Sequence, residues 1–289
     1  MLFFNRPGET ARVFEAVARA RPRTLLLVAD GPRPTVPRDA ERCAATRAVV
    51  DRIDWPCDVL HNFSDRNLGC TNRVVSGLDW AFSRVDCAIV LEDDCVPDPS
   101  FFPYAEALLE RYYDDERIVH IAGSGLGHPI RTAADSYIFS RFPIPWGWAT
   151  WSRAWRHFDV RMTDWPLLRD SGWLQTLLGD PVAVAAWEDI FGRVYAGGVN
   201  DWTFQWVYTC WRLDGLSTIP SVNLVSNIGI TDDATHMDDA QEWGYLVNRP
   251  TSGVKSTLNH PATIATIPAM EAMIRAFWVR ARNKHPVAG

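Results

Sequence analysis

The sequence predicts an α/β fold in which helices flank a mostly parallel central sheet. Over residues 2–122, short apolar runs of strand length alternate with longer stretches of helical periodicity. Strands separated by helices of this length pair in parallel through right-handed crossovers. The chain has 289 residues, of which 47% are hydrophobic and 22% are charged. This composition is that of a globular protein and excludes a disordered or collagen-like chain.

The elements of the first part follow from apolar runs that stop at turn-forming or acidic residues. Residues 2–4 and 24–29 are the first two expected strands, and the second ends at Asp30-Gly31. Residues 87–91 form an apolar run of the kind that is buried on both faces of a sheet, and it stops at three consecutive acids. The other expected strands are 58–62 and 118–122, and the expected helices are 9–19, 38–53, 72–82 and 101–113.

The chain changes character after Gly123, where glycine, proline and tryptophan become frequent. Ten of the 14 tryptophans lie between Trp146 and Trp211. We expect a Trp-rich subdomain on the same sheet, with short helices at 167–178, 181–195 and 201–212. Trp151 and Trp155 have the i, i+4 spacing of one helix face and are expected in the core, as are Trp187, Trp206 and Trp211.

Charge and cysteine usage limit the partners and the compartment. The net charge of −6 argues against nucleic-acid binding, because neutralising phosphates requires a basic surface. The six cysteines form no CxxC pair, and no apolar run reaches the roughly 18 residues of a membrane span, so we expect a cytoplasmic protein. A last helix, expected at 267–284, carries basic residues beside apolar ones. It is either docked on the protein or held peripherally at the inner face of the membrane.

The consecutive acids Glu92, Asp93 and Asp94 are the first functional signal. Ligands of open α/β sheets lie beyond the carboxyl ends of the strands, where Asn5-Arg6 and Asp30-Gly31 are also expected. Three adjacent carboxylates repel one another, and a shared cation favours their ionised form. Mg²⁺ and Mn²⁺ prefer carboxylate oxygens and often complete their coordination with water and substrate phosphates. The pattern therefore predicts a divalent cation and a phosphate-bearing substrate.

Six motifs follow one another along residues 4–202. They are Phe4-Asn5-Arg6-Pro7, Asp30-Gly31, Asn67-Leu68-Gly69, Leu91-Glu92-Asp93-Asp94 with Pro99-Ser100-Phe101-Phe102, Trp146-Gly147-Trp148, and Asn200-Asp201-Trp202. This ordered set resembles the nucleotide-sugar-dependent glycosyltransferases of the GT-A fold. The similarity is to family 2-like members and, in the acidic signature, to N-acetylglucosaminyltransferase I. It implies a Rossmann-like GT-A sheet and a metal-dependent, inverting sugar transfer from a nucleoside-diphosphate donor, with UDP-sugars favoured, to a saccharide or glycoconjugate acceptor in polysaccharide biosynthesis.

The resemblance also implies roles for residues on the donor side. Asp94 corresponds to the ligand of Mn²⁺ or Mg²⁺, Asp93 faces the ribose or the water shell of the metal, and Glu92 faces the donor sugar. Arg6 approaches the diphosphate, and Asp30 accepts a hydrogen bond from an imide-bearing base such as uracil. The remaining donor-side residues are Asn5, Asn72 and Arg73 in the nucleotide-sugar site and His236 as a further metal ligand. The alternative for His236 is a place in a solvated turn. The alternative for Arg73 is an exposed arginine at a helix start.

On the acceptor side, the resemblance places Asp201 as the general base that deprotonates the attacking hydroxyl. Asp201 also precedes an expected helix, and an N-cap aspartate keeps one carboxylate oxygen for chemistry. Trp146, Trp148 and Trp202 are expected to contact the acceptor, because an indole face stacks on the apolar face of a sugar.

These roles divide the chain into a nucleotide-sugar and metal-binding half at 1–123, an acceptor-binding and catalytic half of the same domain at 124–248, and a C-terminal linker and helix at 249–289. Two other functions stay open. One is a sugar nucleotidyltransferase, although the chain lacks the glycine-rich N-terminal turn of such enzymes. The other is a carbohydrate-binding protein or degenerate transferase without turnover.

Overall fold

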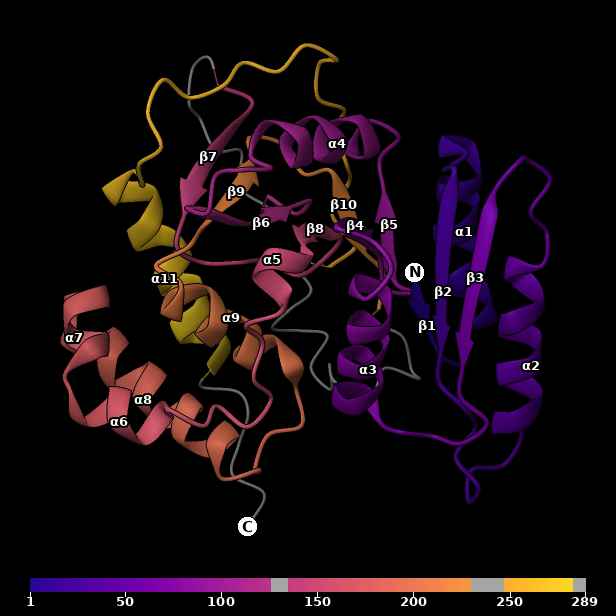
Figure 1. The fold of residues 1–289 in the computed structure, drawn as a ribbon, viewed down its shortest axis with the longest axis horizontal. Helices are drawn as coiled ribbons and strands as arrows, with labels where there is room; N and C mark the ends of the chain where they lie inside the picture. Colours follow the sequence, from indigo (N-terminus) through magenta and orange to yellow (C-terminus); the bar gives the residue numbers. More distant parts are fainter. Residues whose placement is uncertain (126–134, 230–246, 283–289) are drawn as a thin grey trace.

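The computed structural model of the chain describes residues 1–125, 135–229 and 247–282. A parallel sheet contains β1 (Leu2–Phe3), β2 (Thr24–Ala29) and β3 (Asp58–Phe63), in the order β1-β2-β3. A second sheet, in the order β4-β8-β6-β9-β7, contains β4 (Cys87–Val90), β6 (Ile118–Ala122), β7 (Tyr137–Ser140), β8 (Trp148–Trp151) and β9 (Leu216–Pro220). Figure 1 shows the parallel sheet at the right and the second sheet at the centre.

The two sheets meet between β1 and the end of β4. Leu2 forms a parallel bridge with Glu92, and its N–H donates to the Leu91 carbonyl at 2.8 Å. β1 therefore lies between β2 and the end of β4. The carboxyl ends of these three strands point the same way.

The predicted α/β class is confirmed and the first sheet is parallel, but the prediction of a mostly parallel sheet is wrong for the second sheet. In the second sheet only β6 and β9 pair in parallel, whereas β4–β8, β6–β8 and β7–β9 are antiparallel. A further antiparallel pair joins β5 (Cys95–Pro97) to β10 (Val225–Asn227). Strands β7 and β8 are buried at every position, so they lack the alternation of apolar and polar residues that marks a half-exposed strand.

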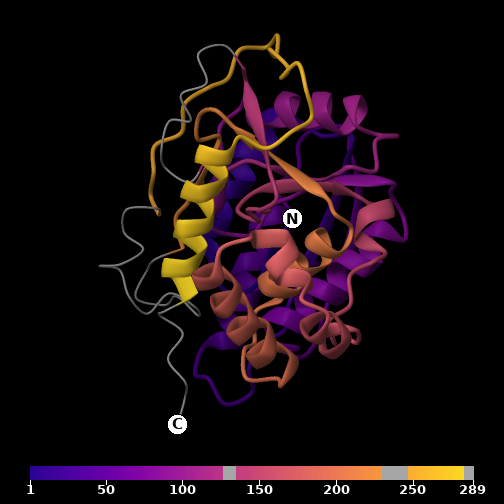
Figure 2. The same ribbon diagram turned by 90° about the vertical axis from the view of Figure 1, so that its left-hand side faces the viewer.

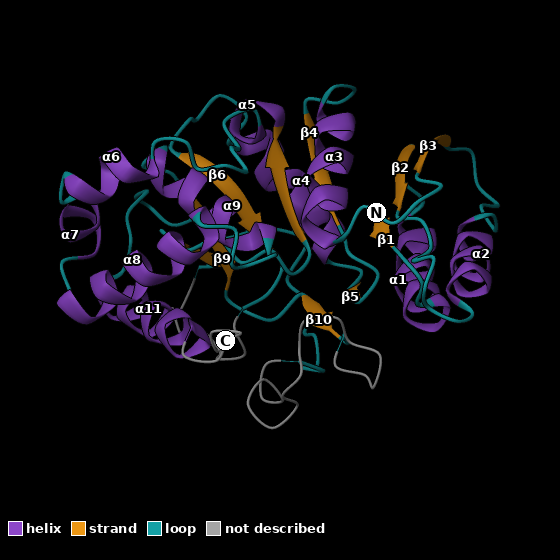
Figure 3. Cartoon of the chain, turned by 90° about the horizontal axis from the view of Figure 1, so that it is seen from below, coloured by secondary structure: helices purple, strands orange, loops and turns teal. Residues whose placement is uncertain are grey.

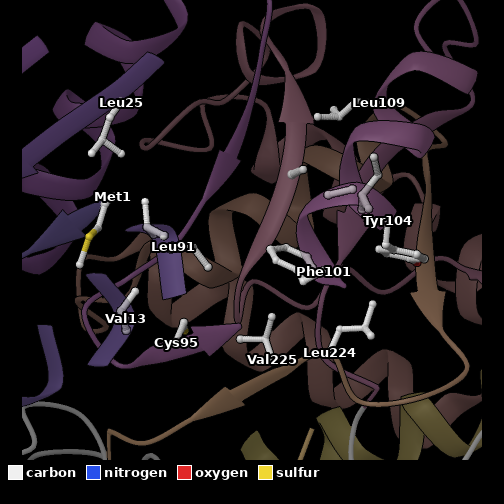
Figure 4. Close-up of a cluster of buried hydrophobic side chains, with 14 of the residues drawn as sticks. Met1, Val13, Leu25, Leu91, Cys95, Phe101, Tyr104, Leu109, Leu224 and Val225 are labelled. Atoms are coloured by element: carbon white, nitrogen blue, oxygen red, sulfur yellow. The ribbon is translucent and has the colours of Figure 1, made fainter. Parts of the chain in front are cut away.

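Helices cover both faces of the sheets. On one face α1 (Pro7–Ala20), α2 (Asp39–Val50) and α4 (Phe101–Arg111) pack against the strands, and Figure 4 shows part of this core, where Phe101 and Tyr104 of α4 lie near Leu224 and Val225. On the other face lie α3 (Cys70–Phe82), α5 (Ser152–Trp155) and α9 (Trp202–Arg212). Figure 3 shows α1 and α2 together on one side of β2 and β3.

A separate helical group lies at the end of the molecule opposite α1 and α2 (Figures 1 and 3). It contains α6 (Trp165–Asp170), α7 (Trp173–Leu178), α8 (Pro181–Tyr195) and α11 (Pro268–Arg282) around a second apolar core. The single helix expected at 167–178 is in fact two helices, because Gly172 adopts a left-handed conformation with φ of 72° between them. α9 joins both cores: Trp202 and Trp206 face the sheet, and Phe204 and Trp211 face the helical group.

Helix α11 runs along the outside of this group, as Figure 2 shows. Ile274 is buried in the helical core, and Met270 and Met273 pack against it. Arg275 donates to the Leu178 carbonyl at 3.2 Å and pairs with Asp180 at 3.3 Å. The apolar side chains at residues 270, 273 and 274 of α11 are thus covered by protein, so this part of the helix is docked on the protein. Within the described ranges, no helix is both long and apolar enough to cross a bilayer.

Trp151 and Trp155 are both buried, as predicted, but they do not share a helix face. Trp151 is the last residue of β8, and α5 begins at the next residue. Side chains alternate along a strand, so Trp148 and Trp151, three residues apart, point to opposite faces of the sheet. Trp151 packs in the core beneath α4, whereas Trp155 and Trp148 pack with α3 and α9.

Candidate functional site

The ends of β1, β2 and β4 bring the three predicted polar clusters to one edge. Asn5-Arg6 follows β1, Asp30-Gly31 follows β2, and the acids 92–94 follow β4. β1 pairs with β2 on one side and bridges to Glu92 on the other. The expectation that these clusters share one edge of the sheet is therefore confirmed.

Arg6 binds two of the three acids. Its Nη2 donates to Asp93 and to Asp94 Oδ2, the second contact at 3.1 Å. The second carboxylate oxygen of Asp93 accepts from the Phe4 N–H at 3.1 Å. The side chains of Arg6, Asp93 and Asp94 are only 17%, 5% and 17% exposed, so these contacts are largely shielded from water.

The charges at this edge do not balance. Burial raises the pKa of Glu92 well above its usual value, and the charges of Asp94, Asp93 and Asp201 raise it further, while Arg6 lowers it. Burial also raises the pKa of Asp93 to about 6, against the opposing effect of Arg6. Among the described residues, four carboxylates therefore face one guanidinium. Such an excess of hard, anionic oxygens favours binding of a further cation.

Asp201 reaches this group from the other half of the chain. It is the N-cap of α9, and its Oδ1 accepts a hydrogen bond from the Thr203 N–H at 2.9 Å. Its charge raises the pKa of both Glu92 and Cys70, and the apolar residues at the start of α9 pack in one cluster with those of α3 and β4, so the start of α9 lies near the end of β4. The expected N-cap role is confirmed. The second carboxylate oxygen accepts no hydrogen bond from the described residues.

Cys70, the first residue of α3, was missed by the sequence reasoning. Burial raises the pKa of its thiol, and the charges of Glu92, Asp201, Asp93 and Asp94 raise it further. The thiol is thus held neutral among all four carboxylates. No sequence signal marks this position apart from its place directly after Gly69 at a helix start.

Asn227 and Gly229 are a second pair of neighbours that the sequence reasoning did not place in the site. β10 pairs with β5 so that Asn227 lies opposite Cys95, and the Ile228 N–H donates to the Asp94 carbonyl at 2.8 Å. The Gly229 N–H donates to Asn227 Oδ1 at 2.8 Å. A β-carbon on residue 229 would overlap Asp94 Oδ2, so a larger residue there would require the Asp94 carboxylate to shift.

Asp30 organises a loop. Its carboxylate accepts from the backbone N–H groups of Gly31 and Leu68, both at 2.9 Å, and from that of Gly69 at 3.2 Å. Asn67 Nδ2 donates to it at 3.0 Å, and the residue is 5% exposed. These four donors fill the acceptor positions of the carboxylate. This placement supports the turn-forming alternative for Asp30, and its binding of the nucleobase stays a prediction.

The other predicted nucleotide residues are also held by the protein. Asn5 is buried and its side-chain amide donates to Asp39. Arg73 is 7% exposed and its Nη2 donates to the backbone carbonyl and side chain of Asn62. Arg73 therefore lies in the interior, contrary both to the prediction that it lines the nucleotide site and to the alternative of an exposed arginine. Asn72 is exposed and donates to the Leu68 carbonyl at 3.2 Å.

The three predicted acceptor tryptophans differ in burial. Trp148 and Trp202 are 0% and 3% exposed and stack on each other, with ring centres 5.8 Å apart. The other face of Trp148 is near His120, whose ring is 5.1 Å away and nearly parallel. This burial contradicts the prediction that Trp148 and Trp202 contact an acceptor, because their ring faces are covered. Trp146 is only partly buried against the core and keeps an exposed portion.

The donor set at this edge suits a hard divalent cation that takes few protein ligands. Asp94 offers a carboxylate near Glu92, whose pKa is raised by burial and by the charges of its acidic neighbours. The described residues contain no group of three or more His, Cys, Asp and Glu side chains arranged to enclose a metal ion. Mg²⁺ and Mn²⁺ commonly accept one or two carboxylates and fill the rest with water and phosphate. His236, the other predicted ligand, lies outside the described residues.

No protein-family model matches the chain, and no curated protein matches it.

Proposed function

We propose that the protein is a metal-dependent glycosyltransferase of the GT-A type. The donor is a nucleoside-diphosphate sugar, with UDP-sugars favoured, and the acceptor is a saccharide or glycoconjugate. One observation carries the proposal: Asp201 at the start of α9 lies close enough to Glu92 at the end of β4 for its charge to raise the pKa of Glu92, and Arg6 pairs with Asp93 and Asp94 beside it. The ordered motifs that resemble this family include all five residues.

The donor side uses Asp94, Arg6 and Glu92. Asp94 would hold Mn²⁺ or Mg²⁺, and Arg6 would add positive charge for the donor diphosphate. When bound, the cation offsets the charge that develops on the leaving nucleoside diphosphate. Glu92, whose pKa is raised by burial and by its acidic neighbours, is protonated more readily than an ordinary glutamate. A protonated Glu92 can donate a hydrogen bond to a hydroxyl of the donor sugar.

The acceptor side uses Asp201. Its Oδ1 is engaged by the Thr203 N–H, and Oδ2 takes the proton of the attacking hydroxyl. The acceptor oxygen forms a bond to C1 of the sugar as the bond from C1 to the diphosphate oxygen breaks. The configuration at C1 inverts, and the nucleoside diphosphate leaves. Trp146, with its partly exposed indole, contacts the acceptor in this scheme.

A panel of nucleotide sugars with Mn²⁺ tests the proposal, with release of nucleoside diphosphate as the readout. We expect release from at least one donor, loss of release with EDTA, and a fall of at least about a hundredfold in Asp94→Asn. Asp98→Asn is the matched control. Asp98 follows Asp94 closely in the sequence, but its carboxylate accepts hydrogen bonds from Ser100 and does not contact the acids 92–94.

Two results would replace the proposal with another function. Pyrophosphate release from a nucleoside triphosphate and a sugar phosphate would identify a nucleotidyltransferase. Sugar binding that is indifferent to nucleotide and to Mn²⁺ would identify a carbohydrate-binding protein without turnover.

A further inference from the structure

Trp148 connects the strand that precedes the acids to the helix that carries Asp201. In β8 it lies opposite Val90 of β4, two residues before Glu92. Its indole is 0% exposed and stacks on the indole of Trp202, the residue after Asp201, with ring centres 5.8 Å apart. One buried side chain therefore joins the end of β4 to the start of α9.

The chain that precedes Asp201 gives the carboxylate little support. Residues 195–198 and 200 are exposed, so they do not pack against the body of the protein. Among the described residues, Asp201 accepts one hydrogen bond, and this bond comes from the Thr203 N–H of its own helix. The position of the carboxylate is therefore set by the position of the first turn of α9.

The first turn of α9 rests on Trp148. Within the described part of the chain, Trp148 is the only aromatic side chain whose ring contacts Trp202. Trp148 also contacts Trp206, one turn further along the helix, with ring centres 5.4 Å apart. Trp206 has a second anchor, because its indole N–H donates to His120 at 3.1 Å. A smaller residue at 148 would leave Trp206 held and would remove the aromatic support of Trp202.

We propose that Trp148 is a positioning residue that sets the place of Asp201 relative to the end of β4 through Trp202, a role that rests on the proposed function. Trp148 has no exposed surface with which to touch a substrate. A misplacement of a reacting group by about 1 Å can lower turnover by about a hundredfold. Binding of donor and metal should change less, because the backbone pairing of β8 with β4 does not depend on the indole.

The test compares Trp148→Phe with Trp165→Phe, using the donor that the nucleotide-sugar panel identifies. Trp165 is the matched control: it is 1% exposed, its indole N–H, like that of Trp148, has no partner among the described residues, and it packs against Phe191 in the helical core. We expect the kcat of Trp148→Phe to fall at least about tenfold, with the Kd of UDP and of Mn²⁺ within about threefold of the wild type. Trp165→Phe should keep kcat within about threefold of the wild type.

A double-mutant cycle with Asp201→Asn separates positioning from a general loss of folded protein. If Trp148 acts through Asp201, then Trp148→Phe should change kcat by less than about threefold when Asp201 is already asparagine. A variant that lowers kcat only because less protein is folded lowers it by the same factor in both backgrounds. Circular dichroism establishes which variants are folded. Trp202→Phe shortens the same contact from the side of α9 and takes the place of Trp148→Phe if that variant is not folded.

The inference is overturned if the variant at 148 or 202 keeps kcat within about threefold of the wild type, or lowers it by the same factor in both backgrounds. An equal loss of kcat in Trp165→Phe, or a loss of UDP and Mn²⁺ affinity as large as the loss of kcat, also overturns it. These results leave the proposed function intact. A wild-type protein that releases nucleoside diphosphate from no donor of the panel contradicts both the proposed function and the role of Trp148.

Discussion

Gly229 lies directly against the carboxylate of Asp94, where the β-carbon of any larger residue would overlap Oδ2. The contact results from the pairing of β10 with β5, which sets Asn227 opposite Cys95. Residues more than 130 positions apart in the sequence thus meet at the acidic signature. Asp94 Oδ2, the atom that approaches Gly229, also accepts a hydrogen bond from Arg6 Nη2 at 3.1 Å.

Gly229→Ala should disturb the site without unfolding the protein. The added β-carbon must push either the Asp94 carboxylate or the backbone of residues 227–229, and we expect Mn²⁺ affinity with UDP to fall by about tenfold or more. Gly253→Ala is the matched control, since its β-carbon would meet Asp98 only at 3.6 Å, an ordinary contact. Calorimetry checks both variants. Unchanged affinity in Gly229→Ala would show that Asp94 does not need this position.

Asp30→Ala should reduce stability, because it leaves several buried donors without an acceptor. The Leu68 and Gly69 N–H groups and Asn67 Nδ2 all lose a partner, so we expect the free energy of unfolding to fall by about 2–4 kcal/mol. Urea unfolding measures this change. Asp65→Ala, an exposed acid of the same loop, should stay within about 0.5 kcal/mol of the wild type.

The Asp30 variant also distinguishes a structural role from nucleobase recognition. If Asp30→Ala kept wild-type stability and lost only affinity for UDP, then Asp30 would bind the base, and the loop-organising role would be wrong.

His120 should make the protein less stable in acid. The Trp206 indole N–H can only donate, so His120 Nδ1 accepts it at 3.1 Å, and the ring proton lies on Nε2, which donates to the Ile144 carbonyl at 3.1 Å. Burial lowers the pKa of His120 from its ordinary 6.5 to about 3. Between these values the unfolded chain binds a proton that the folded protein does not. The free energy of unfolding therefore falls as the pH falls, by up to about 1.4 kcal/mol per pH unit.

His120→Phe removes this contribution. Urea unfolding between about pH 6 and pH 4 should give a slope that is shallower than the wild-type slope by about 1.4 kcal/mol per pH unit. The variant is expected to be less stable at every pH, because Trp206 and Ile144 lose a partner, but that loss does not change the slope. Parallel slopes for the two proteins would mean that His120 is protonated in the folded state.

The parts of the fold that were predicted from the sequence depend on local signals. Helix α8 covers Pro181–Tyr195, as predicted, because Asp180 caps it and Pro181 is compatible with its first turn. The shared position of Arg6 and the acids 92–94 at one edge of the sheet was predicted because the carboxyl ends of parallel strands meet at the same edge. Both arguments need only residues that are near one another in the sequence or in a βαβ unit.

The parts that were not predicted depend on pairing between distant segments. The sequence around Trp148 predicts an irregular stretch. Trp148 is buried because β8 pairs in antiparallel fashion with β4 and β6. Cys70 and Gly229 carry no pattern of their own and enter the site because α3 and β10 approach the end of β4 and β5. An aspartate at the end of a strand, such as Asp30, is a common ligand-binding residue. Its burial depends on the loop 67–69, which folds over it.

In the proposed reaction Asp201 acts as the base of the sugar transfer. A comparison of two N-cap variants tests this role. Asp180 is also an N-cap aspartate and accepts from Val182 and Ala183 at the start of α8, so Asp180→Asn is the matched control for Asp201→Asn. Asparagine caps helices about as well as aspartate, so both variants should remain folded.

The measurement is the turnover of a nucleotide-sugar donor with Mn²⁺ and acceptor in the two variants. Asp201→Asn should keep the affinity for UDP and Mn²⁺ within about threefold and lose turnover by at least about a hundredfold, while Asp180→Asn should keep wild-type turnover. Full turnover in Asp201→Asn, or an equal loss of turnover in both variants, would contradict the role of Asp201 as the base.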